Sequence, residues 1–224
     1  MNDLLRRRRA MMRKVSGDVV LPDGFQKCVY LENSTRLNLE NTIKYFDTLI
    51  NPDLTHELEV KFEMLGNITT DGVFSQHCGY IGGGYNSIGY YNNGSPRCSY
   101  GTRDLGYNSD SLMPRSGVPT TVKYSWKDRY ILNETTDYRL DLSAYEYTQP
   151  TTSTLRFFFR GYGPYSVTSA MRIYFLKMWS DGNLIRNYIP CLDNNGVPCF
   201  YEAVSGSPCY ATPEGRPPFS YLLE

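Results

Sequence analysis

Apolar and charged side chains alternate without a break in the segment HELEVKFEML (56–65). The apolar positions are Leu58, Val60, Phe62 and Met64, and the charged positions between them are Glu57, Glu59, Lys61 and Glu63. Successive side chains of a β-strand point to opposite faces of its sheet. The segment therefore predicts a strand with one buried face and one solvated outer face.

Two more segments carry the same period of two. In TVKYSWKDRYIL (121–132), Val122, Tyr124 and Trp126 share one side. In STLRFFFRGY (153–162), the apolar side holds Leu155, Phe157 and Phe159, and the other side holds Arg156 and Arg160. Each segment predicts a further half-buried strand.

Turn signals separate the apolar segments in the last third of the chain. Asp181-Gly182 stands between two apolar runs and predicts a tight hairpin, because that turn needs residues that tolerate positive φ. Further breaks fall at 193–196 and 205–208. Helix signals are nearly absent after residue 17, and the chain holds 20 Tyr, 10 Phe, 19 Gly and 13 Pro. Short strands joined by turns predict an all-β fold, an antiparallel sandwich or barrel.

The charge distribution divides the chain into two parts. The 224 residues carry 23 basic and 23 acidic side chains, but residues 1–17 hold six basic residues and only one acidic residue. We therefore expect a basic arm over residues 1–20 and one folded domain over 21–224, an asymmetry that indicates an interaction arm.

The arm does not read as an export signal, because Arg13, Lys14 and Asp18 interrupt the apolar stretch that a signal peptide needs. No window reaches the roughly 18 apolar residues of a membrane span. We expect a protein without an export signal of its own and without membrane insertion.

The cysteines and histidines do not predict a metal or cofactor site. Six cysteines lie at 28, 78, 98, 191, 199 and 209, without any C-x-x-C pair, and the two histidines, His56 and His77, are not spaced as ligands. The sequence is compatible with one disulfide between two of Cys191, Cys199 and Cys209, but free buried thiols are the favoured interpretation. Asp193, Asn194 and Asn195 are conceivable calcium ligands, and a polar turn explains them better.

Residues 79–108 are rich in tyrosine and glycine. Strands with glycines at bulges and turns are the plainer interpretation. The alternative is a tyrosine-lined surface for sugar or protein contact, because tyrosine offers an apolar ring and a hydroxyl group. Candidate contact residues are Tyr85, Tyr90 and Tyr91.

Two stretches together resemble a known family. LPDGFQKCVYLENSTRLNLENTIKYFDTLI (21–50) resembles the opening, and RIYFLKMWSDGNLIRNYIPCLDNNGVPCFYEAVSGSPCYATPEG (172–215) the closing segment, of a module common in gut phage (crAss-like) virion proteins and bacterial surface proteins. Members share the concanavalin A-like lectin/glucanase jelly roll, also called laminin G-like. The resemblance implies an antiparallel jelly-roll β-sandwich with an N-terminal basic arm. The chain departs from the pattern between Glu32 and Phe46, in the Gly/Tyr-rich middle and at Cys199 and Cys209.

The fold hosts glycosidases as well as lectins, so catalysis has to be judged from the individual residues. Retaining glycosidases need two carboxylates about 5–5.5 Å apart. Glu57 and Glu59 are the nearest candidates, with Glu63 on the same face, and a solvated outer face explains them. Trp126 and Trp179 could stack on sugars, but their apolar neighbours favour core or inter-sheet packing. No Ser/His/Asp arrangement is visible, and we expect a non-enzymatic protein without cofactors.

The leading hypothesis is a structural subunit of a tailed bacteriophage virion: a head-fibre, capsid-decoration or tail-associated protein. The arm would bind other virion proteins, since arginine bonds carboxylates bidentately. Its binding residues would be Leu4, Leu5, Arg6, Arg7, Arg8, Arg9, Arg13 and Lys14. The sandwich would project outward, as a dimer or trimer, and contact host-surface glycans.

Two other hypotheses stay open. A bacterial surface or secreted carbohydrate-binding module would share the sandwich, but the missing export signal counts against it. Nucleic-acid binding through the arm alone would be salt-dependent. The acidic remainder of the chain offers no basic groove to extend such binding, so a nucleic-acid partner is disfavoured.

Overall fold

The computed structural model describes residues 19–33, 45–65, 87–90, 96–100, 103–104, 112, 117–147, 154–162, 165–168, 171–211 and 219–224, with side chains outside 87–104 and 159–168. Of the arm expected over residues 1–20, residues 1–18 lie outside these ranges. Within them every regular element is a β-strand and every strand pairing is antiparallel. The predicted all-β, antiparallel fold is therefore confirmed for the described residues.

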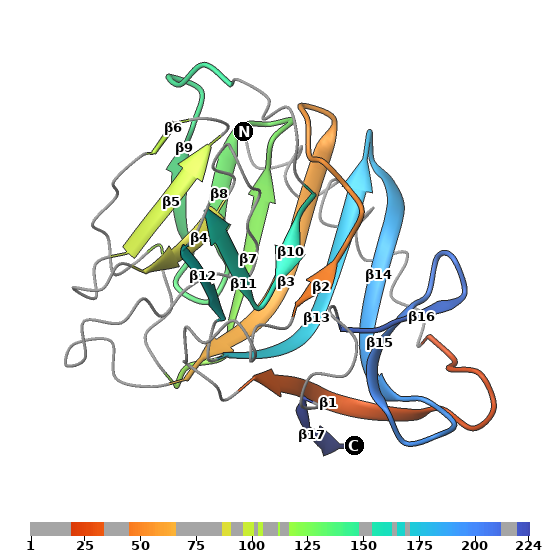
Figure 1. Ribbon diagram of the computed structural model, residues 1–224. Coiled ribbons are helices and arrows are strands. Elements are labelled where there is room, and N and C mark those ends of the chain that lie inside the picture. Colours follow the sequence, from red (N-terminus) through yellow and green to blue (C-terminus); the bar gives the residue numbers. More distant parts are fainter. Residues whose placement is uncertain are drawn as a thin grey trace.

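One large sheet organises the molecule (Figure 1). Its order is β16-β15-β14-β1-β13-β3-β7-β8-β9, and β17 pairs with β1. The bounds are β1 Gln26–Asn33, β3 His56–Met64, β7 Thr120–Ser125, β8 Tyr130–Asn133, β9 Tyr138–Asp141, β13 Met171–Ser180, β14 Asn183–Leu192, β15 Pro198–Glu202, β16 Ser207–Cys209 and β17 Ser220–Leu223. The predicted strand at 56–65 is β3, near the middle of this sheet.

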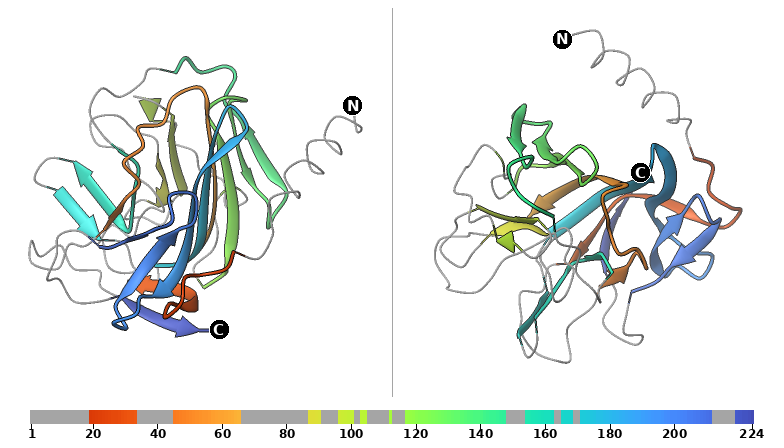
Figure 2. Two further views of the ribbon diagram at one scale, coloured as in Figure 1. Left: turned by 90° about the vertical axis from the view of Figure 1, so that its right-hand side faces the viewer. Right: turned by 90° about the horizontal axis from the view of Figure 1, so that it is seen from above.

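Shorter strands form smaller sheets on one side of the large one, which the turned views separate from it (Figure 2). Their bounds are β2 Phe46–Asp47, β4 Ser87–Tyr90, β5 Pro96–Tyr100, β6 Arg103–Asp104, β10 Arg156–Phe157, β11 Phe159–Tyr162 and β12 Tyr165–Thr168. They pair as β2–β10, β11–β12 and β4–β5–β6. The expectation of strands within the Gly/Tyr-rich middle is thus confirmed for β4, β5 and β6.

The core lies between the large sheet and the short strands. Its sheet side includes the alternate residues of β3, from Leu58 to Met64, and its other side includes Phe46, Phe157 and Phe158, all of them buried. Phe46 contacts Phe200 of β15 edge-on, with ring centroids 4.8 Å apart. The apolar alternation read from the sequence is what gives the large sheet its one buried face.

The hairpin predicted at Asp181-Gly182 is confirmed. Ser180 pairs with Asn183, and both turn residues have positive φ, 49° for Asp181 and 81° for Gly182. Two such residues in succession make the turn type whose twist matches that of paired strands. The resulting β13–β14 hairpin forms the middle of the sheet.

Two predicted strands are divided by turns. Segment 121–132 forms β7 and β8, because Arg129 adopts a φ of 53° and the Ser125 hydroxyl accepts a hydrogen bond from the Asp128 N–H. Segment 153–162 forms β10 and β11, with Phe158 at a φ of 64° between them. Positive φ is incompatible with a continuous strand. The expected burial of Leu155 and Phe157 holds, and the Phe159 side chain lies outside the described residues.

The part of the chain that the structure describes contains no helix long and apolar enough to cross a membrane.

Candidate functional site

The outer face of the large sheet gathers the charged and aromatic residues that alternate with the core. Four neighbouring strands align Trp179 of β13, Glu57 of β3, Ser125 of β7 and Tyr130 of β8 in one row of directly paired residues. Neighbouring strands lie about 4.8 Å apart, so these side chains stand side by side. The row joins segments that are more than a hundred residues apart in sequence.

This row borders a small hollow, the Glu57 hollow. Its lining residues are Glu57, Leu58, Lys123, Tyr124, Ser125, Tyr130 and Trp179. The space over these residues is about 230 Å³, but this includes space open to solvent, so the hollow is a shallow depression of the sheet surface and does not enclose a small molecule. Such a hollow suits a ligand that lies across the sheet surface.

Hydrogen bonds hold the floor of the Glu57 hollow. The Ser125 hydroxyl donates to Glu57 Oε1 at 3.1 Å and accepts from the Asp128 N–H at 2.9 Å. On one side the Arg139 guanidinium lies 4.0 Å from the centre of the Tyr130 ring. Cation–π contact of this kind restrains the ring without covering its edge. Trp179, on the other side, is half-buried.

Lys123 joins two carboxylates beside the hollow. Its ammonium donates to Glu134 at 2.6 Å and lies 3.8 Å from Glu59. Burial raises the pKa of Glu59, and the nearby Lys123 opposes that shift. A raised pKa is one property of a general acid, but Glu59 does not line the hollow.

Further along the same face, Arg172 bridges the strands β1 and β3. It donates to Glu32 at 2.7 Å and to Glu63 at 3.2 and 3.3 Å, and the Tyr174 hydroxyl donates to Glu63 at 2.6 Å. The bond to Glu32, followed by that to Glu63, raises the pKa of Arg172. Burial and the bond to Glu63 raise the pKa of Tyr174.

This network corrects the expectation of a simply solvated outer face. Glu63 is only 6% exposed, and Tyr30 packs edge-on against Tyr174, with ring centroids 5.6 Å apart. The sequence pattern could not show that Glu63 is buried and bonded, because its partners Arg172 and Tyr174 come from another strand, β13. Glu32 and Glu63 are both occupied by Arg172, which leaves them poorly placed as a catalytic pair.

An Asp/His/Ser grouping that the sequence analysis missed lies at the start of β3. His56 Nδ1 is 2.8 Å from Asp53 Oδ1, and Ser180 pairs with His56 in the sheet register. The Ser180 hydroxyl, however, shares its 3.0 Å hydrogen bond with Thr55. Burial would raise the pKa of Asp53, but hydrogen bonds from Thr55 and His56 outweigh it and lower that pKa. The grouping closes the turn before β3.

The sequence analysis favoured a polar turn at Asp193 over a calcium site, and the structure shows such a turn. Its Oδ1 accepts from the N–H groups of Asn195 and Val197 at 2.8 and 2.9 Å, and its Oδ2 accepts from the Tyr210 hydroxyl at 2.8 Å. Both carboxylate oxygens are therefore engaged. No cluster of three metal-ligating side chains occurs among the described residues.

The comparisons with known proteins give a weak structural likeness. No family model and no curated protein matches the chain. The enzymatically active domain of tailspike protein 2 from bacteriophage CBA120 is similar at 19% identity and a TM-score of 0.43, over 75% of this chain and 30% of that chain. Full-length tailspike protein 2 from an Escherichia coli O157:H7 bacteriophage is similar at 15% identity and a TM-score of 0.40, over 75% and 27%. This chain thus spans less than a third of either tailspike.

The residues predicted for binding fall largely outside the described part. The arm residues and Tyr85 and Tyr91 lie outside it, and for Tyr90 only its place in β4 is described. Trp126 is fully buried, as expected. Trp179 corrects the prediction of core packing, because it follows the buried Met178 and so faces outward. The alternation of Leu176 and Met178 with Lys177 and Trp179 is the local signal for an outward Trp179, but Met171 and Ile173 lie on the opposite parity and mask it.

Proposed function

We propose that this protein is a non-enzymatic structural component of a tailed bacteriophage virion whose sandwich binds host-surface glycans on the outer face of its large sheet. The observation that carries the glycan part is the Glu57 hollow, with Trp179 and Tyr130 on either side of Glu57 and Ser125. Sugar rings present apolar C–H faces and a rim of hydroxyls. Aromatic faces next to carboxylate and hydroxyl groups match both.

The virion part of the proposal rests on sequence. The opening and closing segments resemble the concanavalin A-like, laminin G-like jelly roll of gut phage (crAss-like) virion proteins. We propose the same jelly roll for this chain, in a head-fibre, capsid-decoration or tail-associated subunit. The basic arm, including Arg6 and Arg13, would bind acidic surfaces of other virion proteins. The assembled form would be a dimer or trimer.

The arrangement of the carboxylates favours binding over catalysis. Glu32 and Glu63 both hold Arg172, and Glu57 accepts a hydrogen bond from Ser125. Glu59 has a raised pKa but stands beside Lys123, away from the lining of the hollow. A glycosidase needs two carboxyl groups that flank the scissile bond together. The proposed role is therefore binding.

A glycan array probed with the full chain tests the sugar-binding part. Binding to a defined set of glycans, together with no release of reducing ends from them, is the expected result. Hydrolysis that a Glu59→Gln variant abolishes would show an enzyme instead. Failure of the chain to bind any glycan on the array would refute the sugar-binding part of the proposal.

The virion part needs a separate measurement. Particles assembled with a chain that lacks residues 1–17 should not incorporate it, whereas the full chain should be incorporated. Unchanged incorporation would refute the anchoring role of the arm. The alternative, a bacterial surface or secreted carbohydrate-binding module, shares the Glu57 hollow and predicts glycan binding without any incorporation.

A further inference from the structure

A small group of buried residues lies apart from the main core, near the beginning of β1. Its members are Cys28, Ile189, Cys191, Leu192 and Cys199. Three of the four cysteines whose side chains the structure describes are thus gathered in one place, and all four are free thiols. The arrangement of the group also selects one pair among them.

Cys191 of β14 and Cys199 of β15 are directly opposite in the sheet register, and their sulfur atoms are 3.5 Å apart. Directly paired residues of antiparallel strands have Cα atoms about 4.5–5.5 Å apart. Disulfides usually span Cα distances of about 4.4–6.8 Å. The backbone of this pair therefore already has the spacing that a disulfide needs.

The other two described cysteines are placed differently. Cys209 of β16 pairs with Phe200, so it shares the face of Phe200, which is opposite to that of Cys199. Its sulfur lies 4.0 Å from the backbone oxygen of Asp47, on the core side. Cys28 pairs with Leu223 of β17. Among the cysteines with described side chains, only Cys191 and Cys199 face each other across a single ladder position.

We propose that Cys191 and Cys199 are a redox-sensitive thiol pair, which a small disulfide such as oxidised glutathione converts to an intrachain disulfide across β14 and β15. The Cys191 thiolate attacks one sulfur of the small disulfide and releases the first thiol. The Cys199 thiolate then attacks the Cys191 sulfur of the mixed disulfide and releases the second thiol. The protein loses two electrons and two protons, and the small disulfide gains them.

The electrostatics of the pair favour this order. The hydrogen bond with Cys199 lowers the pKa of Cys191, and the same bond and burial raise the pKa of Cys199. Burial raises the pKa of Cys28 to about 11 and that of Cys209 to about 11. The thiolate is the nucleophile in thiol–disulfide exchange. Cys191 is therefore the first of the four to react.

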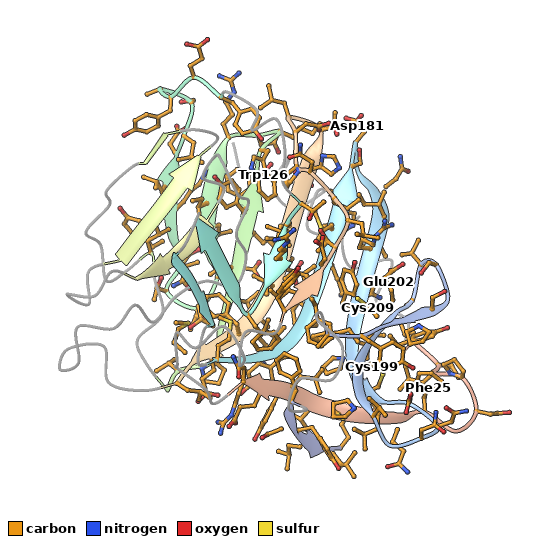
Figure 3. The ribbon with its side chains drawn as sticks, viewed as in Figure 1. Phe25, Trp126, Asp181, Cys199, Glu202 and Cys209 are labelled. Carbon is orange, nitrogen blue, oxygen red and sulfur yellow. The ribbon has the colours of Figure 1, made fainter. Side chains whose placement is uncertain are left out.

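The segment before β1 packs against the strands that carry the pair. Phe25 packs edge-on against Tyr201, with ring centroids 5.7 Å apart, and Tyr201 shares a face of β15 with Cys199. Gly24 approaches Asn194 of the β14–β15 turn closely. Figure 3 shows Phe25 and Cys199 at the same end of the molecule. Because both sulfurs are buried, oxidation requires local opening of the structure, and if this opening occurs at the segment before β1, a Phe25→Ala variant should be oxidised faster.

Peptide mapping of the full chain tests the pairing. The reduced protein is incubated with oxidised glutathione, free thiols are alkylated, and the chain is cleaved before Asp193 and after Glu202, which separates Cys191, Cys199 and Cys209. A link between the peptides of Cys191 and Cys199 is expected. A link from Cys191 to Cys28 or Cys209, or no link at all, would overturn the proposal.

Two variants sharpen the result. Cys199→Ala should leave glutathione attached to Cys191, whereas Cys209→Ala should still form the Cys191–Cys199 link.

The oxidised wild type should unfold at a Tm higher than that of the reduced protein by roughly 5 °C, as a short closed loop implies. The mapping of the wild type decides the pairing even if Cys199→Ala does not fold.

Discussion

Trp179 and Glu57 stand directly opposite each other on the neighbouring strands β13 and β3, and both line the same hollow on the outer face of the large sheet. The pairing places a large aromatic ring beside a carboxylate that Ser125 holds by a hydrogen bond. Half-buried aromatic residues on a sheet surface contribute binding area at a small entropic cost. This relationship, rather than any single motif, makes the outer face the candidate binding surface.

We expect Trp179→Ala to weaken glycan binding about tenfold or more, because truncation of a central aromatic contact typically costs this much affinity. Phe175→Ala is the matched control, since Phe175 lies on the same strand and face but does not line the hollow. Affinities measured by isothermal titration with a glycan found on the array would check this. Equal losses in both variants would show that the hollow is not the binding site.

Loss of the Arg172 guanidinium should destabilise the fold. Arg172→Met would leave the Glu63 carboxylate, which is 6% exposed, without its cation. We expect the free energy of unfolding to fall by about 2–3 kcal/mol, measured by urea denaturation.

Lys127→Met is the control for this change, because the Lys127–Asp181 pair is exposed. It should have no measurable effect on stability. If the two variants were equally stable, the bridge between β1 and β3 would not contribute to folding.

Stability should fall in acid partly through Glu202. Burial would raise its pKa, but hydrogen bonds from the N–H groups of Asn187, Val204 and Ser205 outweigh burial and lower the pKa. The stability that Glu202 contributes is therefore complete above its unfolded pKa of about 4.3 and is lost as the pH falls through the lower folded value.

A Glu202→Gln variant isolates this contribution. At pH 7 the variant should be less stable than wild type by roughly 1–2 kcal/mol. As the pH falls below about 4 the difference between the two urea midpoints should shrink, and the midpoints should converge below the folded pKa of Glu202. A difference that stayed constant between these pH values would mean that the charge of Glu202 plays no part.

The tight turn of the β13–β14 hairpin gives a backbone prediction. Gly182→Val should destabilise the protein by about 1–2 kcal/mol, because φ at this position is 81° and open space surrounds it, so only backbone strain is added. Asn183→Val, at the first position of β14, provides the comparison and should be nearly neutral. Thermal unfolding would distinguish the two, and equal Tm values would contradict the strain argument.

The parts of the fold that follow from neighbouring residues were predictable. The alternation in 56–65 predicted β3, and Asp181-Gly182 predicted the hairpin, because side-chain direction and positive φ are properties of the local backbone. The divisions at Arg129 and Phe158 were missed, since both residues adopt positive φ that their residue types do not signal.

The candidate site was predicted only in part. Glu57 was identified as a surface carboxylate, but Trp179 was assigned to the core, because Met171, Ile173 and the bulge before Phe175 obscure the parity of β13. The Tyr85, Tyr90 and Tyr91 contacts and the arm stay predictions. That the protein has no catalytic activity also stays a prediction, which the assay for released reducing ends would check.

The sequence by itself determined that the described chain is an antiparallel β protein, which residues of β3 face inward, and where the chain reverses at 181–182. Only the tertiary structure decided that Trp179 meets Glu57, that Arg172 joins Glu32 to Glu63, and that Cys191 faces Cys199 rather than Cys209. The physical reason is register. Local alternation sets which face a side chain takes, whereas its neighbours depend on which strands pair and at which residue.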